Sequence, residues 1–282
     1  MATPRAVSEH YEEQKRLAVA TVTATRRQWR GMGRDWDASW RTVRPRLQVI
    51  LTAAQLRSAR QGAAYVPRAL AEQGMNPRVL GRVVPERFAG TAADGRPLDT
   101  LLDGALIRSK AAESLDAGLA FLEAVVETEV EDAARGASSV AITARQRTGW
   151  VRVVNTPCCA DCAVLAGKFF KANTGFQRHP HCRCFHLPTT VANPDVSGPA
   201  FDPPVDQITG LSEGERKALE AGADLSQVVN SRRGRSKLTT TAGTTRRGPA
   251  AGRRRLSPDG IYQIASDEQE ALRLLRQHGY LR

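Results

Sequence analysis

The sequence predicts a mainly α-helical protein, in which a helical N-terminal domain is followed by a small Cys/His-rich α+β knuckle and a partly disordered basic C-terminal arm. The first observation is composition: 282 residues with 41% hydrophobic and 25% charged content are typical of a folded chain with one large domain or two ordinary ones. The second is the recurrence of apolar residues at spacings of three, four and seven through most of the first 147 residues. The third is the crowding of all five cysteines into residues 158–184.

We expect five segments along the chain. They are a helical domain (1–147), the Cys/His-rich knuckle (148–192), a linker with short helices (193–230), a disordered basic arm (231–256) and a C-terminal helix (257–282). In the helical domain, the apolar spacing predicts helices over 8–30, 35–60, 66–72 and 99–147, with a connector rich in proline and glycine over 75–97.

Two sets of side chains in this domain need an interpretation. Trp36 and Trp40 lie four residues apart on one helix face, so we expect both in the core rather than in a functional aromatic site. Glu123, Glu127 and Glu131 also share a face, as in a metal or acid-base cluster. Helical carboxylate metal sites use histidine partners, and none accompanies these glutamates, so we expect a solvated acidic face.

From residue 148 the pattern changes to a predicted strand (150–154), a turn and a helix (160–170). Cys159 and Cys162 are separated by two residues, sixteen residues follow, and His179 and Cys182 are again separated by two, which is typical of zinc sites with two knuckles. Two residues in a tight turn can both face one tetrahedral ion, and the second pair completes the shell. We therefore predict a structural zinc site with these four ligands, and with Cys184 as the substitute.

Other interpretations of this region stay open. Cys158, His181 and His186 also lie within reach, and the cysteines could instead be reduced, packed thiols or form a disulfide. A catalytic Cys162 with His181 as its base is conceivable, but a complete metal shell would quench the thiolate. The sequence has no GxSxG, HExxH, P-loop or GxGxxG motif, so these patterns give no indication of an enzyme.

The net charge of +12 favours an acidic partner, such as nucleic acid or an anionic surface. Residues 230–255 carry nine basic side chains and no acid, in a stretch that is too poor in apolar residues to bury a core. We expect this arm either to neutralise DNA phosphates or to be a solvated basic linker. The candidate DNA-binding residues are Arg232, Arg233, Arg235, Lys237, Arg246, Arg247, Arg253, Arg254 and Arg255.

Short helices are expected on both sides of the arm. Ser212 and Glu215 form a capping-box pattern in a helix over 211–220, and a further turn follows over 222–230. Ser257 and Pro258 begin a terminal helix, which we expect either to dock on a partner or to pack on its own domain. No segment approaches the ~20 apolar residues of a membrane helix, and charges interrupt residues 1–16, so we expect no membrane partner and synthesis in the cytosol.

The segment CADCAVLAGKFF, followed by GFQRHPHCRC and Pro188, resembles the C-terminal motif of MuF-like minor head proteins of tailed bacteriophages, in which a CxxC precedes HPxCxC. The helical stretches HYEEQKRL, RRQWR, DASW and AAQLRSARQGAAYVP are similar to the actinobacteriophage branch of that family. So are GLSEGERKALEAGADLSQVVNSRRG and RLSPDGIYQIASDEQEALRLLRQHGYLR, and together these stretches cover most of the chain.

The resemblance implies a minor capsid protein present in a few copies inside the virion near the portal, after assembly in the host cytoplasm. Its implied roles are head morphogenesis and genome packaging or delivery, and its implied partners are the portal, the major capsid protein and packaged double-stranded DNA. The alternative is a capsid maturation protease, a label that this group often carries. Some relatives carry a fused protease or toxin domain, whereas this sequence beyond residue 190 has short helices, the arm and a terminal helix. We therefore expect a protein that is not an enzyme.

Overall fold

The computed structural model describes residues 3–281, except residues 173, 177, 180, 181, 193 and 243–253. The fold is mainly α-helical with a small strand-containing Cys/His region, as predicted. The chain forms two compact units, a helical unit (1–153 and 168–196) and a C-terminal unit (154–167 and 197–282). Of the segment 148–192, residues 148–153 and 168–192 fall in the helical unit, and residues 154–167, with the CxxC pattern, fall in the C-terminal unit.

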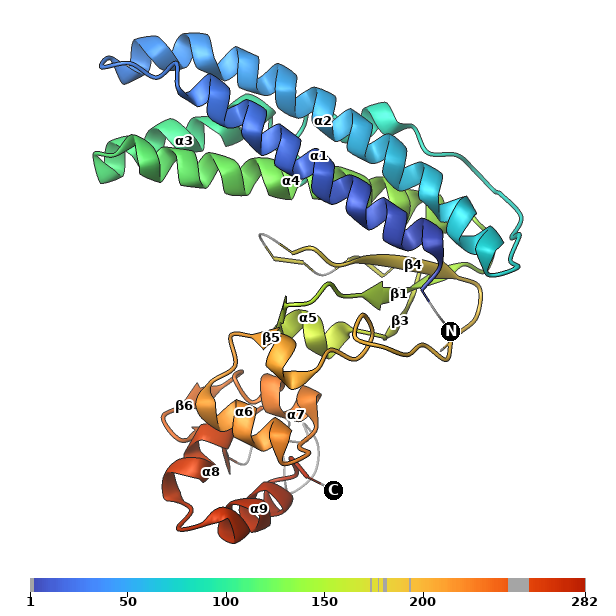
Figure 1. Cartoon of the computed structure of the whole chain (residues 1–282), viewed down its shortest axis with the longest axis vertical. Helices are drawn as coiled ribbons and strands as arrows, with labels where there is room; N and C mark the ends of the chain where they lie inside the picture. Colours follow the sequence, from blue (N-terminus) through green and yellow to red (C-terminus); the bar gives the residue numbers. More distant parts are fainter. Residues whose placement is uncertain are drawn as a thin grey trace. The chain divides into compact units, whose positions relative to one another are not determined.

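The helical unit is a bundle in which α2 and α4 make the most extensive contact, α1 packs on both, and α3 packs mainly on α4 (Figure 1). A short 3-10 helix, η1, lies in the connector between α2 and α3 and packs on α2. Its helices are α1 (Arg5–Trp29), α2 (Trp36–Glu72), η1 (Pro85–Phe88), α3 (Leu98–Ala112) and α4 (Leu115–Thr143).

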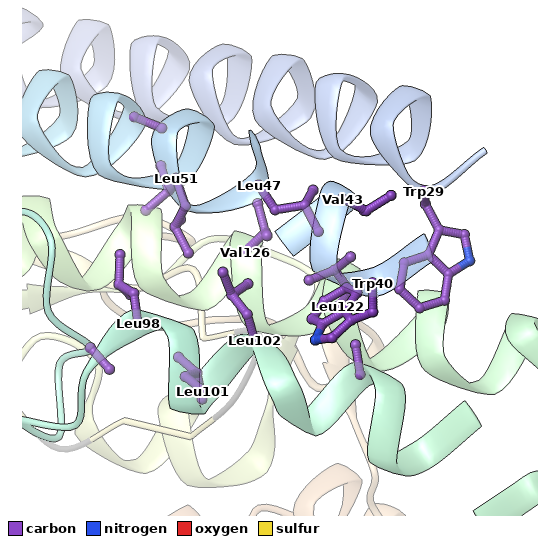
Figure 2. Packing of buried hydrophobic residues seen from close by; sticks show 14 of the residues in the cluster. Trp29, Trp40, Val43, Leu47, Leu51, Leu98, Leu101, Leu102, Leu122 and Val126 are labelled. Carbon is purple, nitrogen blue, oxygen red and sulfur yellow. The ribbon is translucent and has the colours of Figure 1, made fainter. Parts of the chain in front are cut away.

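The core of the bundle is lined by apolar side chains from all four α-helices (Figure 2). Leu51, Leu102 and Leu122 are completely buried there. Trp40 is buried and Trp36 packs against the same cluster, which confirms their predicted place in the core. Burial of such side chains contributes roughly 1.5–3 kcal/mol each, which favours the bundle over its separated helices.

Helix α2 is longer than predicted, because the chain stays helical through the break expected between residues 60 and 66. Gly62 lies in this stretch, where α2 crosses α4 so closely that a Cβ on Gly62 would lie 2.8 Å from the Cα of Ala134. The missing side chain thus allows the backbones to approach rather than ending the helix. The tract predicted as one helix over 99–147 is instead two helices, because Glu113 adopts a left-handed conformation and Ser114 caps α4.

A three-stranded antiparallel sheet in the order β3-β1-β4 completes the helical unit. Its strands are β1 (Gly149–Val153), β3 (Phe169–Lys171) and β4 (Phe185–Thr189). Trp150 is buried in the sheet and stacks on Phe170, its partner across the strands, with 4.4 Å between ring centroids. This pairing explains why residues 169–171 form a strand although the sequence predicted helix to residue 170.

The C-terminal unit consists of short helices and strands (Figure 1). Its parallel pair is β2 (Cys158–Cys159) with β5 (Ile208–Thr209), and β6 (Arg235–Ser236), β7 (Thr239–Thr240) and β8 (Arg255–Leu256) form an antiparallel sheet. Its helices are α5 (Ala160–Leu165), η2 (Val205–Gln207), α6 (Glu213–Glu220), α7 (Leu225–Asn230), α8 (Pro258–Ile264) and α9 (Glu268–Gln277).

The helices α6, α8 and α9 of this unit lie in segments for which the sequence predicted helices. The capping box of Ser212 and Glu215 at the start of α6 is confirmed, because each side chain accepts a hydrogen bond from the backbone of the other residue. The single terminal helix predicted over 257–282 is instead two helices, α8 and α9, which pack on their own unit: Ile261 of α8 and Leu275 of α9 are completely buried in one cluster with Ala218. Among the described residues, no helix is long and apolar enough to cross a membrane.

Candidate metal centre

The CxxC segment places Cys159 and Cys162 on one side of a helical turn. Strand β2 ends at Cys159, which then caps α5: its Sγ accepts a hydrogen bond from the Cys162 backbone N–H at 3.4 Å. An N-cap residue faces the first turn of its helix, so the spacing of two residues brings both sulfur atoms to the same end of α5. Cys162 is buried, whereas Cys159 is half-buried.

The second ligand segment is a turn that leads into β4. The backbone N–H of Cys182 donates to the carbonyl of His179 at 3.1 Å, which closes the turn. Cys182 and Cys184 are both buried, and Phe185 then begins the strand that pairs with β1. The strand register thus fixes the backbone directly after the second pair of cysteines.

The structure brings all five predicted metal ligands together in two overlapping groups. The ligand atoms of Cys159, Cys162 and His179 all lie within 4.8 Å of one another, and so do the sulfur atoms of Cys162, Cys182 and Cys184. Sulfur atoms bound to one tetrahedral zinc at 2.3 Å lie about 3.8 Å apart, so the spacing within each group is compatible with ligands of one ion. A donor set of thiolates and one imidazole suits zinc better than magnesium or calcium, which prefer oxygen ligands. These Cys/His groups can therefore hold a metal ion.

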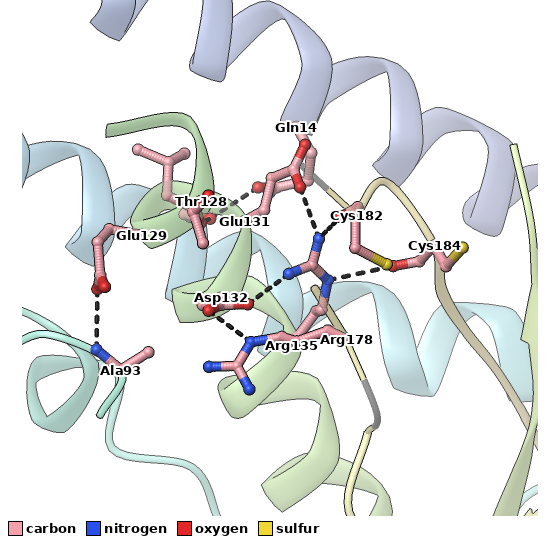
Figure 3. Close-up of polar contacts among 12 residues, drawn as sticks. Gln14, Ala93, Thr128, Glu129, Glu131, Asp132, Arg135, Arg178, Cys182 and Cys184 are labelled. Atoms are coloured by element: carbon pink, nitrogen blue, oxygen red, sulfur yellow. Dashed lines mark hydrogen bonds and ion pairs between the residues drawn. The ribbon is translucent and has the colours of Figure 1, made fainter. Parts of the chain in front are cut away.

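Arg135 on α4 holds the segment that carries two of these ligands (Figure 3). Its guanidinium donates to the backbone carbonyl of Cys182, and to that of Cys184 at 3.1 Å. The same group forms ion pairs with Asp132 and, at 2.6 Å, with Glu131. The side chain of Arg135 is 8% exposed, so this network is well shielded from solvent. Buried ion pairs of this kind position backbone precisely when every donor and acceptor is satisfied.

A second buried arginine lies directly beside a ligand atom. Arg152 on β1 is 1% exposed, and its guanidinium donates to the sulfur of Cys182 at 3.4 Å. The same guanidinium stacks over the Phe176 ring, 4.2 Å from the centroid. A fixed positive charge in a buried site favours the thiolate, which is the form that binds metal. Outer-shell hydrogen bonds of this type also orient the ligand.

The other candidate ligands from the sequence lie elsewhere. His186 is completely buried, with its Nδ1 and Nε2 within 3.0 and 3.2 Å of the hydroxyls of Ser138 and Ser139. Burial, followed by the charge of Arg135, holds the pKa of His186 well below its usual value, so the ring is neutral. Cys158 belongs to neither ligand group found in the described part of the chain, and burial raises the pKa of its thiol to about 11. His181 lies outside the described residues.

No family model, curated protein or solved structure matches this chain. The geometry of the Cys/His groups therefore stands on its own as evidence for a metal site.

The three glutamates on α4 are not the solvated acidic face that the sequence predicted. Each is largely shielded from solvent and pairs with an arginine, from α1, from α4 itself or from the cysteine turn. Arg26 of α1 binds Glu123, with one N–O distance of 2.8 Å, and Arg183 binds Glu127 at 2.9 Å. Glu131 pairs with Arg135 in the network described above. The i, i+4 pattern thus marks where basic residues of α1 and the cysteine turn attach to α4.

The predicted arm is more ordered than expected where the structure describes it. Residues 231–242 and 254–256 form turns and the sheet β6-β7-β8 rather than a disordered tail. Arg232 pairs with Glu215 at 2.6 Å and Arg235 with Asp259 at 2.5 Å. Arg255 is buried, stacks over Tyr280 and donates to the carbonyl of His278 at 2.7 Å. These contacts use guanidinium groups that the sequence assigned to DNA.

The remaining arm residues fall into two groups. Arg233 and Lys237 are exposed, and Arg254 is exposed with a 3.1 Å hydrogen bond to Thr239. Arg246, Arg247 and Arg253 lie outside the described residues.

Proposed function

We propose that this chain is a MuF-like minor head protein of a tailed bacteriophage, located in a few copies inside the capsid near the portal. One observation carries the proposal. The CADC and HPHCRC segments, on which the resemblance to that family depends, hold the residues whose ligand atoms converge in the structure. Residues of a sequence motif that converge on one candidate site are better support than similarity of helical segments.

The site is proposed to hold zinc in a structural role. Cys162, Cys182 and Cys184 are all buried. The hydrogen bonds from Arg135 to the carbonyls of Cys182 and Cys184 restrict the turn that carries these two residues. Structural zinc sites are closed by four protein ligands, whereas catalytic sites keep one position open for water or substrate. Five candidate ligands are more than enough for a closed shell.

The two units are proposed to serve assembly and genome handling. The helical unit offers long rigid helices for contacts with the portal or the major capsid protein. The exposed basic residues of the C-terminal unit, together with the basic residues over 243–253, are proposed to contact packaged double-stranded DNA without sequence preference.

Quantitative mass spectrometry of purified particles of the parent phage tests this function. The expected result is a few full-length copies of this chain per particle, together with a major capsid protein that has its original N-terminus. Absence of the chain from particles would contradict the proposal. Self-cleavage of the chain together with a trimmed capsid protein would also contradict it, and would favour a capsid maturation protease.

A further inference from the structure

The hairpin of α1 and α2 carries a second concentration of positive charge. Residues 14–60 contain eleven lysines and arginines and two aspartates, Asp35 and Asp37, which gives a net charge of +9. This equals the nine charges of residues 230–255. The net charge of the whole chain does not reveal this concentration, because acidic residues in other segments offset the positive charge of the hairpin.

Several of these arginines project from the outer faces of the two helices. Arg16 and Arg27 on α1 are exposed and eleven residues apart, and so are Arg46 and Arg57 on α2. Eleven residues make three helical turns, so each pair lies on one face with a rise of about 16 Å between its members. None of the four has an ion-pair partner among the residues that the structure describes.

The acidic face of α4 has little free charge to offer these arginines. Glu123, Glu127 and Glu131 already pair with arginines, and Asp132 pairs with both Arg135 and Arg178. Exposed acids such as Glu12, Glu113 and Asp116 lie apart, on α1 and around the turn between α3 and α4, so a second copy of the chain would offer only scattered negative charges. The positive charge of the hairpin favours a partner with a dense row of unneutralised anionic groups.

The residue types on this surface favour phosphates over bases. Single-stranded nucleic acid is bound mainly by stacking of bases on aromatic side chains. In this hairpin Trp29 and Trp40 are 5% exposed and pack edge to face with each other in the core. Arginine is suited to phosphate, because its planar guanidinium can donate two parallel hydrogen bonds.

We infer that the outer face of the α1–α2 hairpin binds the phosphate backbone of duplex DNA, independently of base sequence. Duplex DNA carries one negative charge per about 1.7 Å of its axis, so arginines spaced along a helix find phosphates in many registers. The inference concerns a surface other than the C-terminal basic residues in the proposed function. It stands whether or not the chain is a component of a phage head.

The test compares two full-length variants that each lose four positive charges. The hairpin variant is R16Q/R27Q/R46Q/R57Q, and the control is R78Q/R82Q/R87Q/R147Q, which changes exposed arginines of the same unit that lie outside the hairpin. Binding to a 30-base-pair duplex is measured by fluorescence anisotropy at several salt concentrations, and circular dichroism checks that both variants fold. Each lost phosphate contact lowers the slope of log K against log salt by about 0.9.

We expect the hairpin variant to lose at least about tenfold in affinity at 0.1 M salt, with a slope reduced by about 2–4, and the control to change much less. Equal losses in the two variants would overturn the inference, because net charge alone would then explain binding. Unchanged DNA binding by a folded hairpin variant would also overturn it. If sedimentation showed that this variant instead loses salt-sensitive self-association, the arginines would serve contacts between copies of the chain.

Discussion

Replacing Arg135 by methionine tests whether the network on α4 positions the metal ligands. Methionine is unbranched and flexible, so it replaces the aliphatic part of the arginine side chain without the charge or the donors. The change leaves Glu131 without its arginine, reduces the partners of Asp132 to Arg178, and removes the donor from the carbonyls of Cys182 and Cys184.

The size of the effect follows from burial. The side chains of Asp132 and Glu131 are 3% and 13% exposed, so their charges gain little from water when the guanidinium is lost. Removing one partner of a buried ion pair costs about 3–5 kcal/mol. Removing a hydrogen bond to a metal ligand or its support typically lowers metal affinity by 10-fold to 100-fold. We expect losses of that size in both unfolding free energy and zinc affinity for R135M.

Urea unfolding followed by tryptophan fluorescence is a suitable assay, because all four tryptophans lie in the helical unit. Zinc affinity is measured by competition with a chromophoric chelator. The matched control is R183M, which removes an arginine from the same cysteine turn. The side chain of Arg183 is 53% exposed and pairs with Glu127. A pair in which one partner is well exposed contributes at most about 1 kcal/mol, so R183M should cost far less than R135M. Equal stability and zinc affinity of R135M and R183M would refute the proposed role of Arg135.

Three further predictions follow from single sites. C162S should abolish stoichiometric zinc binding while C158S keeps it, because Cys162 belongs to both ligand groups and Cys158 to neither. Plasma mass spectrometry of the purified variants measures the zinc content per chain. Burial raises the pKa of Glu129 to about 7, so the unfolded chain loses this proton at lower pH than the folded chain does. The free energy of unfolding should therefore fall by roughly 3 kcal/mol as the pH rises from about 4.5 to 7. E129Q should flatten this part of a profile of unfolding free energy against pH, and parallel profiles of the two proteins would contradict the assignment. G62A should lower the urea midpoint, with a cost of about 1–3 kcal/mol from overpacking against α4, while G81A, whose nearest neighbour is 3.9 Å away, should not.

Local patterns in the sequence predicted the elements that depend on neighbouring residues. The apolar spacing located α1 and the helical tract that the structure divides into α3 and α4, and the capping box of Ser212 and Glu215 located the start of α6. The Cys/His spacing identified the residues that converge in the structure, because ligands separated by two residues are brought together by one turn. These features need no information from distant parts of the chain.

The features that the sequence did not reveal depend on contacts between distant residues. Arg135 reaches carbonyls 47 and 49 positions away, and its position in an amphipathic helix gave no sign of this. Residues 255–256 became ordered because Arg255 packs against Tyr280 and because strands β7 and β8 pair. The exposed arginine faces of the hairpin could not be predicted, because the sequence does not show which arginines form ion pairs with acids on other helices.

The most direct test of the metal centre is zinc X-ray absorption spectroscopy on the full chain purified without added metal, combined with elemental analysis. We expect one zinc per chain, with a shell of sulfur ligands at about 2.3 Å and, where His179 is bound, one nitrogen at about 2.0 Å. A chain that contains no zinc, or whose cysteines are all titratable as free thiols before and after a chelator is added, would contradict it.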